Sequence, residues 1–171
     1  MKLLVHSCCA PCSISCVADI RLQNIEPHLF WYNPNIHPGT EYTARRDSLS
    51  EFAKSDNLEL IIDNETLDFF LSKSAENTIL GESRKFCEKC YSIRLEKTAS
   101  FAAKKAYNAF TTTLLISPYQ NHEMIKSIGE QMAAKYNVDF YYRDFRPLFR
   151  ESQSTARARK MYMQKYCGCM K

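Results

Sequence analysis

Short apolar runs alternate with longer segments of helical periodicity along this chain. The apolar runs predict strands at about 3–5, 28–32, 58–62, 110–116 and 138–142. The helical patterns predict helices at about 11–22, 40–54, 65–72, 87–106, 121–136 and 152–165. Strands that alternate with helices indicate an α/β, Rossmann-like fold, in which helices flank a parallel sheet. We expect a single domain over 1–171, with a basic helix and a short tail at about 143–171.

Two of the predicted strands run directly into residues that can carry chemistry. The strand at 3–5 leads into Cys8 and Cys9, and the strand at 110–116 leads into the Ser-Pro-Tyr sequence that ends at Tyr119. Ligands of open parallel sheets bind at the carboxyl ends of the strands. We therefore expect both segments at one functional edge of the sheet.

Composition narrows the class of protein. Hydrophobic residues make up 45% of the 171 positions and charged residues 25%, which is typical of a folded globular domain. No apolar run approaches the roughly 18 residues that span a membrane. The apolar stretch near the N-terminus is too short for a secretory signal. We expect a cytoplasmic protein with no membrane association.

Eight cysteines are many for a cytoplasmic chain of this length. In a reducing compartment, clustered cysteines more often bind metal or carry out redox chemistry than form structural disulfides. Six of them fall into three clusters, Cys8-Cys9, Cys87-x-x-Cys90 and Cys167-x-Cys169. Cys12 fits either a site or the core, whereas Cys16 is expected to be an ordinary buried residue.

The first two clusters together provide four thiolates. Cys87 and Cys90 are three residues apart at the start of a predicted helix, so both sulfurs lie on one face, where the helix N-terminus favours the thiolate. With Cys8 and Cys9 they match the usual ligand number of a [4Fe–4S] cluster. A four-cysteine zinc site and a dithiol redox motif remain alternatives at this point.

The third cluster is nearly terminal. Gly168 lets the backbone bend, so the sulfurs of Cys167 and Cys169 can meet. A disulfide within Cys-x-Cys closes a strained ring, and strained disulfides are easily reduced. We expect a mobile tail that transfers two electrons, or that provides metal ligands instead.

Positive charge is concentrated near the C-terminus. Residues 143–165 hold seven basic and two acidic residues, an excess larger than the net charge of +4 for the whole chain. Aromatic residues lie between them. This combination suits binding of a phosphate backbone, although a solvated helix face has the same pattern.

The motifs together resemble one family, the QueH cobalamin-independent epoxyqueuosine reductases. The similar segments are LLVHSCCAPCS at 3–13, FWYNPNIHP at 30–38, FCEKCYSIRLEKTA at 86–99, TTTLLISPYQNHEMI at 111–125 and YCGC at 166–169. They occur in the order of the family and span nearly the whole chain. CCAPC, CxxC and a terminal CGC are specific in combination.

The resemblance implies the last step of queuosine biosynthesis, in which epoxyqueuosine at the wobble position of tRNA loses its epoxide oxygen. It implies a [4Fe–4S] cluster on Cys8, Cys9, Cys87 and Cys90, and an additional iron is compatible with it. It implies that the terminal pair Cys167 and Cys169 is a redox-active dithiol, which an unidentified electron donor resets. The fold it implies is nucleotide-hydrolase-like (HUP-type). The glycine-rich phosphate loop of ATP-using relatives is absent, so we do not predict ATP use.

Further residues are candidates for contact with such a substrate. Tyr119 is a candidate proton donor. Asn33 and Asn35 could read the edge of the base, and Trp31 could stack on it or belong to the core. We place the anticodon arm on the basic 143–165 region, with Arg157 and Arg159 as candidate contacts. The alternative function is a zinc-stabilised RNA-binding module without catalysis.

Overall fold

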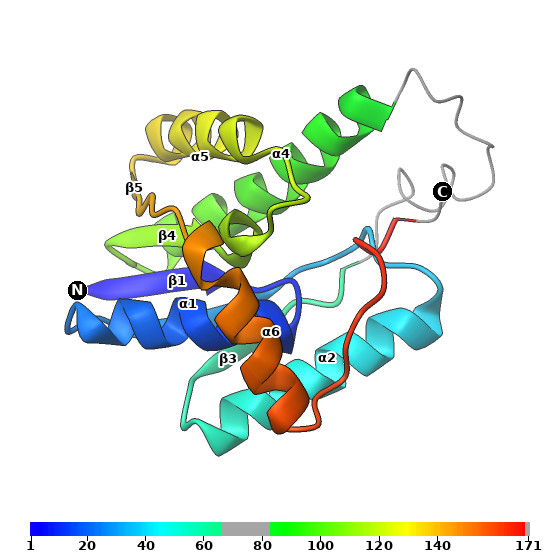
Figure 1. Cartoon of the computed structure of the whole chain (residues 1–171). Helices are drawn as coiled ribbons and strands as arrows, with labels where there is room; N and C mark the ends of the chain where they lie inside the picture. The colour runs from blue at the N-terminus through cyan, green and yellow to red at the C-terminus, as the bar shows by residue number, and fades with distance from the viewer. Residues whose placement is uncertain (66–82, 170–171) are drawn as a thin grey trace.

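Five parallel strands form the sheet of the computed structural model, which describes residues 1–65 and 83–169 (Figure 1). The strands are β1 (Lys2–His6), β2 (Glu26–Trp31), β3 (Leu60–Ile62), β4 (Ala109–Thr112) and β5 (Asp139–Phe140). Their order in the sheet is β3-β2-β1-β4-β5, and every neighbouring pair is parallel. The central strand β1 is apolar and fully buried at Leu3, Leu4 and Val5. The predicted parallel sheet is thereby confirmed.

Helices cover both faces of this sheet. On one side, α1 (Ala10–Leu22) contacts α2 (Gly39–Ser55) and α6 (Phe149–Ala158). On the other side, α4 (Ser83–Lys104) packs against α5 (His122–Tyr136). These bounds lie within a few residues of the predicted ones, except at α6. The helix predicted at 65–72 falls almost entirely on residues 66–82, outside the described residues.

The strand predicted at 110–116 is wrong in its second half. β4 ends at Thr112, and a 3-10 helix, η1 (Thr113–Ile116), follows. The Thr112 hydroxyl accepts a hydrogen bond from the backbone N–H of Leu114 at 3.1 Å and caps this turn. Threonine side chains offer the backbone such local partners in competition with the sheet, which β-propensity alone does not reveal.

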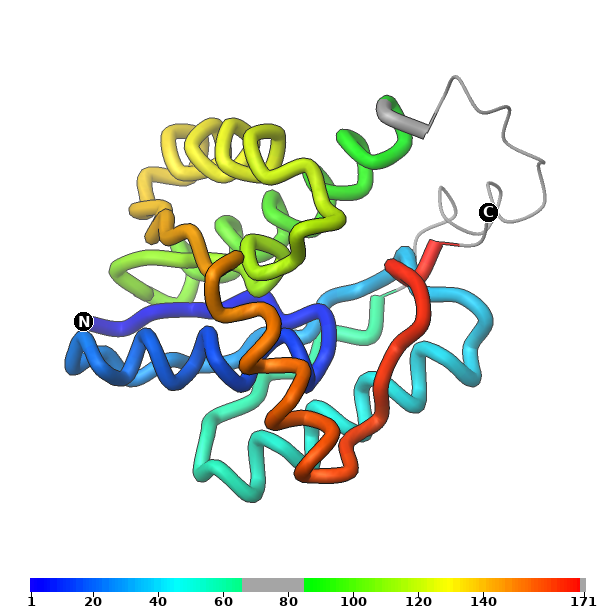
Figure 2. Tube along the Cα trace, viewed as in Figure 1, coloured from blue at the N-terminus to red at the C-terminus, as the bar shows by residue number. Residues whose placement is uncertain are grey.

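The last helix also differs from the prediction of 152–165. It begins at Phe149 and ends at Ala158, because Lys160 adopts a left-handed conformation with φ 55°. The N–H of Met161 then bonds the carbonyl of Ala156 at 2.9 Å, as in many helix C-termini. Residues 160–169, here called the terminal segment, run past α2 to the loop after β2 (Figure 2).

None of the described helices combines the length and apolar character needed to cross a membrane.

Candidate functional site

The ends of β1, β2 and β4 are tied together by polar contacts. The backbone N–H of Cys8 donates to the Thr113 hydroxyl at 3.2 Å. The Asn33 amide donates to the Ser7 carbonyl at 2.9 Å. The segments after β1 and β4 therefore meet at one edge of the sheet, as predicted.

Three buried cysteines lie together at this edge. The Sγ atoms of Cys8, Cys9 and Cys12 are all within 4.8 Å of one another, a spacing that could hold a metal ion. Cys9 is the N-cap of α1, and its sulfur accepts the backbone N–H of Cys12 at 3.3 Å. Hydrogen bonds from Cys12 and Cys9 hold the pKa of Cys8 well below its ordinary value, whereas burial raises that of Cys9. Within the triad, Cys8 is the thiol whose pKa is lowered toward the thiolate form.

The structure shows where Cys12 lies. It joins the cysteine triad, whereas Cys16, one turn later on α1, is fully buried in the core as expected. Cys9-Ala-Pro-Cys12 has the CxxC spacing of Cys87 and Cys90, and it lies at the start of α1. That spacing was the signal in the sequence that could have placed Cys12 in the site. The expected position of Cys87 at a helix start is wrong, because α4 begins four residues earlier, at Ser83.

A second group of sulfurs consists of Cys90 and the terminal pair, Cys167 and Cys169. A hydrogen bond from Cys169 is the main cause that lowers the pKa of Cys90 to about 7. The charge of a Cys167 thiolate opposes that shift, which places Cys167 in the same neighbourhood. Among the described residues, the triad is the one group of three or more metal-ligating side chains within 4.8 Å of one another. The four-thiolate set with Cys87 and Cys90 remains a prediction.

Arg94 lies between the two sulfur groups. Its side chain is 3% exposed, and it donates to Oδ1 of Asn33 at 2.8 Å and to Sγ of Cys90 at 3.8 Å. Its positive charge lowers the pKa of both Cys8 and Cys90. We did not predict this role, although Arg94 follows Cys90 by one helical turn, where side chains share a face.

One large cavity connects these groups with the basic C-terminal region. Its volume is about 1270 Å³, and Cys8, Cys12, Cys87, Cys167 and Cys169 contribute to its wall. The aromatic and basic side chains of its wall are Arg45, Tyr91, Tyr119, Phe149, Arg150, Arg157, Lys165 and Tyr166.

Tyr119 and Phe149 form an aromatic corner in this wall. Tyr119 is 84% exposed and meets the Phe149 ring edge to face at 5.8 Å. Its hydroxyl is therefore accessible from the cavity, and its role as a proton donor remains a prediction.

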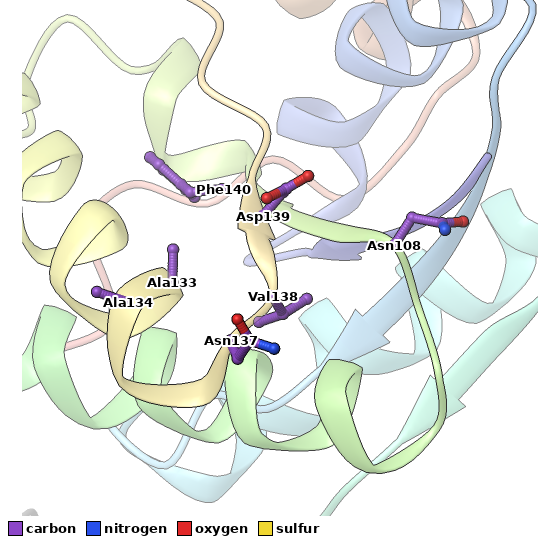
Figure 3. Close-up of a pocket in the computed structure, with 7 residues that line it drawn as sticks. All are labelled: Asn108, Ala133, Ala134, Asn137, Val138, Asp139 and Phe140. Atoms are coloured by element: carbon purple, nitrogen blue, oxygen red, sulfur yellow. The ribbon is translucent and has the colours of Figure 1, made fainter.

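A smaller cavity lies beside β5 and the end of α5 (Figure 3). Its volume is about 430 Å³, and Asp139 is the one ionisable side chain among its seven lining residues. Its lining residues include no cysteine and no basic side chain, so the larger, cysteine-lined cavity is the candidate for chemistry.

Trp31 belongs to the core, which is the second of its two stated alternatives, and the burial of Asn33 argues against its expected contact with a base. Trp31 is fully buried, and its Nε1–H donates to the Tyr42 hydroxyl at 2.8 Å, so its ring has no free face for stacking. Asn33 is 1% exposed and uses both ends of its amide inside the protein. Asn35 is equally buried, and its amide lies 3.9 Å from the sulfur of Cys169.

Arg157 and Arg159 do not share one face. Arg157 lines the large cavity, but Arg159 pairs with Asp56 at 3.1 Å and lies over the Phe52 ring. Arg159 thus joins the ends of α6 and α2 and does not line the large cavity, and its expected contact with the substrate remains a prediction.

Known structures share the fold of this chain. A solved structure titled a predicted subunit of tRNA methyltransferase from Methanocaldococcus jannaschii matches with a TM-score of 0.63 at 12% identity, covering 92% of this chain and 74% of that one. A deacetylase of teicoplanin biosynthesis matches with a TM-score of 0.54 at 10% identity, covering 93% and 83% of the two chains. At such identities the likeness concerns the fold alone, and it agrees with the expected α/β sheet flanked by helices.

Sequence comparison reaches further. The model of the family described as epoxyqueuosine reductase QueH matches residues 3–171. The protein named epoxyqueuosine reductase QueH from Thermotoga maritima is 35% identical over 173 residues, which cover 98% of this chain and 88% of that protein. The protein of the same name from Dehalococcoides mccartyi is 31% identical, with coverages of 99% and 91%. The cysteine-lined edge therefore lies in a chain that belongs to the QueH family.

Proposed function

We propose that this chain is an epoxyqueuosine reductase acting on the wobble nucleoside of tRNA. In this reaction the epoxide takes up two electrons and two protons, loses its oxygen as water and leaves queuosine. The observation that carries the proposal is the convergence of two cysteine groups on one cavity whose wall also holds basic side chains. Membership of the QueH family supplies the substrate.

The donor chemistry of the site fits an iron–sulfur cofactor. Cys8 has a strongly lowered pKa and Cys90 one of about 7, so both favour the thiolate form that binds iron. We propose a [4Fe–4S] cluster on Cys8, Cys9, Cys87 and Cys90, and Cys12 offers a further thiolate for an additional iron. A bound cluster of this type supplies single electrons.

The terminal cysteines are proposed as the source of the electron pair. Cys167 and Cys169 lie beside Cys90, so a dithiol there can give up two electrons and two protons and become a disulfide. An external reductant, still to be identified, returns it to the dithiol. The accessible hydroxyl of Tyr119 is proposed to donate a proton to the departing oxygen.

The anticodon arm is proposed to dock over the cavity. Within residues 1–65 and 83–169, no carboxylate forms an ion pair with the cavity residues Arg150, Arg157 and Lys165. They are therefore available to phosphates, and the aromatic corner of Tyr119 and Phe149 is available to a base. The compartment we propose is the cytoplasm, where tRNA is found and thiols stay reduced.

The proposal is tested by following the modified nucleoside. Anaerobically prepared, iron-loaded protein is incubated with epoxyqueuosine-containing tRNA and a strong reductant, and the nucleosides are analysed by mass spectrometry. We expect conversion to queuosine, with loss of one oxygen atom. A colourless protein that holds zinc, binds this tRNA and yields no queuosine would instead establish the zinc-stabilised RNA-binding module. A Cys167→Ser variant is the control for the terminal pair.

A further inference from the structure

The terminal segment is docked on the loop after β2 and on the start of α2. The N–H of His37 donates to the carbonyl of Gly168 at 2.8 Å. The Tyr166 hydroxyl donates to the carbonyl of His37, and the Tyr162 hydroxyl donates to the carboxylate of Glu41. The segment that we expected to be a mobile tail thus has a defined course (Figure 2).

Arg45 of α2 is at the centre of this docking. Its guanidinium donates to the carbonyl of Tyr166 at 2.8 Å and to the carbonyl of Cys167 at 3.2 Å. Its Nε–H donates to Glu41 at 2.6 Å, and its guanidinium lies 5.2 Å from the centre of the Tyr166 ring. Hydrogen bonds to two successive main-chain carbonyls fix the path of the backbone that carries Cys167.

Burial makes these contacts mutually dependent. The Arg45 side chain is 2% exposed, although its helix lies at the surface of the fold. A buried guanidinium is tolerated only when its donors are satisfied, and here two acceptors belong to the terminal segment. Release of the segment would leave those donors without their carbonyl partners, so Arg45 favours the docked state.

The backbone beyond Cys167 is held equally closely. Gly168 has a φ of 114°, and a Cβ at this position would lie 2.8 Å from Cγ1 of Ile36. The turn at Gly168 brings Cys169 next to the Asn35 amide and to Cys90. Two contacts thus hold the backbone of the cysteine pair. Arg45 binds the carbonyls of Tyr166 and Cys167, and His37 binds the carbonyl of Gly168, which lies between the two cysteines.

We propose that Arg45 is a positioning residue that clamps the terminal segment and holds Cys167 and Cys169 against Cys90. Within the terminal segment, Arg45 donates to the main-chain carbonyls of Tyr166 and Cys167, so it acts through the placement of the pair. The docking stands on geometry alone, whereas its effect on turnover rests on the proposed reductase function. Arg45 also lines the large cavity, but its side chain is 2% exposed, so the proposal assigns it no contact with tRNA.

The test compares Arg45→Gln with Arg46→Gln in the full-length, iron-loaded protein. Arg46 is the next residue of α2, and its guanidinium pairs with Asp47 at 2.8 Å, away from the terminal segment. Amide hydrogen exchange at His37 reports docking, because undocking breaks the hydrogen bond from its N–H to the carbonyl of Gly168. We expect exchange there to be at least about tenfold faster in Arg45→Gln, because two charge-assisted hydrogen bonds are lost, and unchanged in Arg46→Gln. Alkylation of Cys167 and Cys169 by a maleimide should accelerate in parallel.

The second measurement is the steady-state kinetics of epoxyqueuosine reduction. We expect Arg45→Gln to lower kcat about tenfold or more with an unchanged KM for tRNA, since a displaced pair no longer meets Cys90. Unchanged exchange and alkylation in Arg45→Gln would overturn the clamp, and faster exchange with an unchanged kcat would overturn its positioning role. If the wild-type protein reduces no epoxyqueuosine, the proposed function fails. The hydrogen-exchange measurement still shows in that case whether Arg45 holds the terminal segment in place. If Arg45→Gln does not fold, Gly168→Ala undocks the segment from its other side and carries the same expectations.

Discussion

Nη2 of Arg94 donates to Oδ1 of Asn33 over 2.8 Å, and both side chains are buried beneath the cysteines. The same asparagine donates to the carbonyl of Ser7 at 2.9 Å. One amide therefore connects the end of β2 with the end of β1 and with the charged residue of α4. Asn33 supports the geometry of the site from within the protein.

Replacement of Asn33 by Ala should lower the free energy of unfolding by about 2–4 kcal/mol, because the buried guanidinium of Arg94 loses its oxygen acceptor and keeps only the weak one at Sγ of Cys90. Urea denaturation measures this loss. Asn64→Ala is the control, since Asn64 accepts one exposed hydrogen bond from Tyr42, and it should cost less than about 1 kcal/mol. Unchanged stability of Asn33→Ala together with a raised KM for tRNA would return Asn33 to the role of a base reader.

Cys12 and Cys16 offer a matched pair one helical turn apart. Cys12→Ala should reduce the iron bound per chain and the visible absorbance, because it removes one thiolate from the triad. Cys16→Ala should keep the iron and lose only about 1 kcal/mol of stability through a small cavity. Elemental analysis and absorbance spectra of both variants, prepared anaerobically, provide the measurement. Equal iron contents would remove Cys12 from the metal site.

The structure divides the basic C-terminal region into paired and available charges. Arg143 is bound to Asp19 at 2.7 Å and Arg146 to Asp144 at 2.6 Å, whereas Arg150 and Arg157 line the cavity. The double variant Arg150→Gln/Arg157→Gln should raise the KM for tRNA roughly tenfold at moderate salt. The plot of log KM against log salt concentration should also become less steep, by the amount expected for the loss of about two phosphate contacts.

The matched double variant is Arg143→Gln/Arg146→Gln. It removes the same formal charge, but its arginines already have carboxylate partners, so the KM should change less than about threefold. Kinetics over a range of salt concentrations compare the two. Equal effects of both variants would mean that overall charge, and not the wall of the cavity, attracts the tRNA.

Arg159 is predicted to act on stability and not on substrate. Its hydrogen bond is the main cause that holds the pKa of Asp56 below the usual value, so this carboxylate stabilises the folded state above the pKa it has in the unfolded chain. Arg159→Gln should cost up to about 1 kcal/mol at pH 7. The difference from wild type should shrink as the pH falls below about 4, where Asp56 of the unfolded chain becomes protonated, and should be lost once the pH falls below the lower pKa of the folded state.

Denaturation of wild type and Arg159→Gln at both pH values tests this linkage, with KM for tRNA as a second readout. A difference in stability that is the same at pH 7 and at pH 3 would exclude the Asp56 pair as its source.

The sequence by itself determined the alternation of strands and helices and the position of the cysteines at the strand ends. Both follow from local properties: apolar periodicity selects the element, and covalent order places Cys8 and Cys9 directly after β1. Parallel connectivity then brings the ends of β1 and β4 to the same edge, whatever the details of packing. The motifs were sufficient to identify the family.

Only the tertiary structure decided which of these residues act together. Trp31 and Tyr119 are both aromatic residues near strand ends, yet one is fully buried and the other 84% exposed. The roles of Arg94 and Arg45 depend on contacts with Asn33 and Cys167, which are 61 and 122 positions away in sequence. Such contacts depend on how helices pack and where the terminal segment turns, so no local pattern of residues contains them.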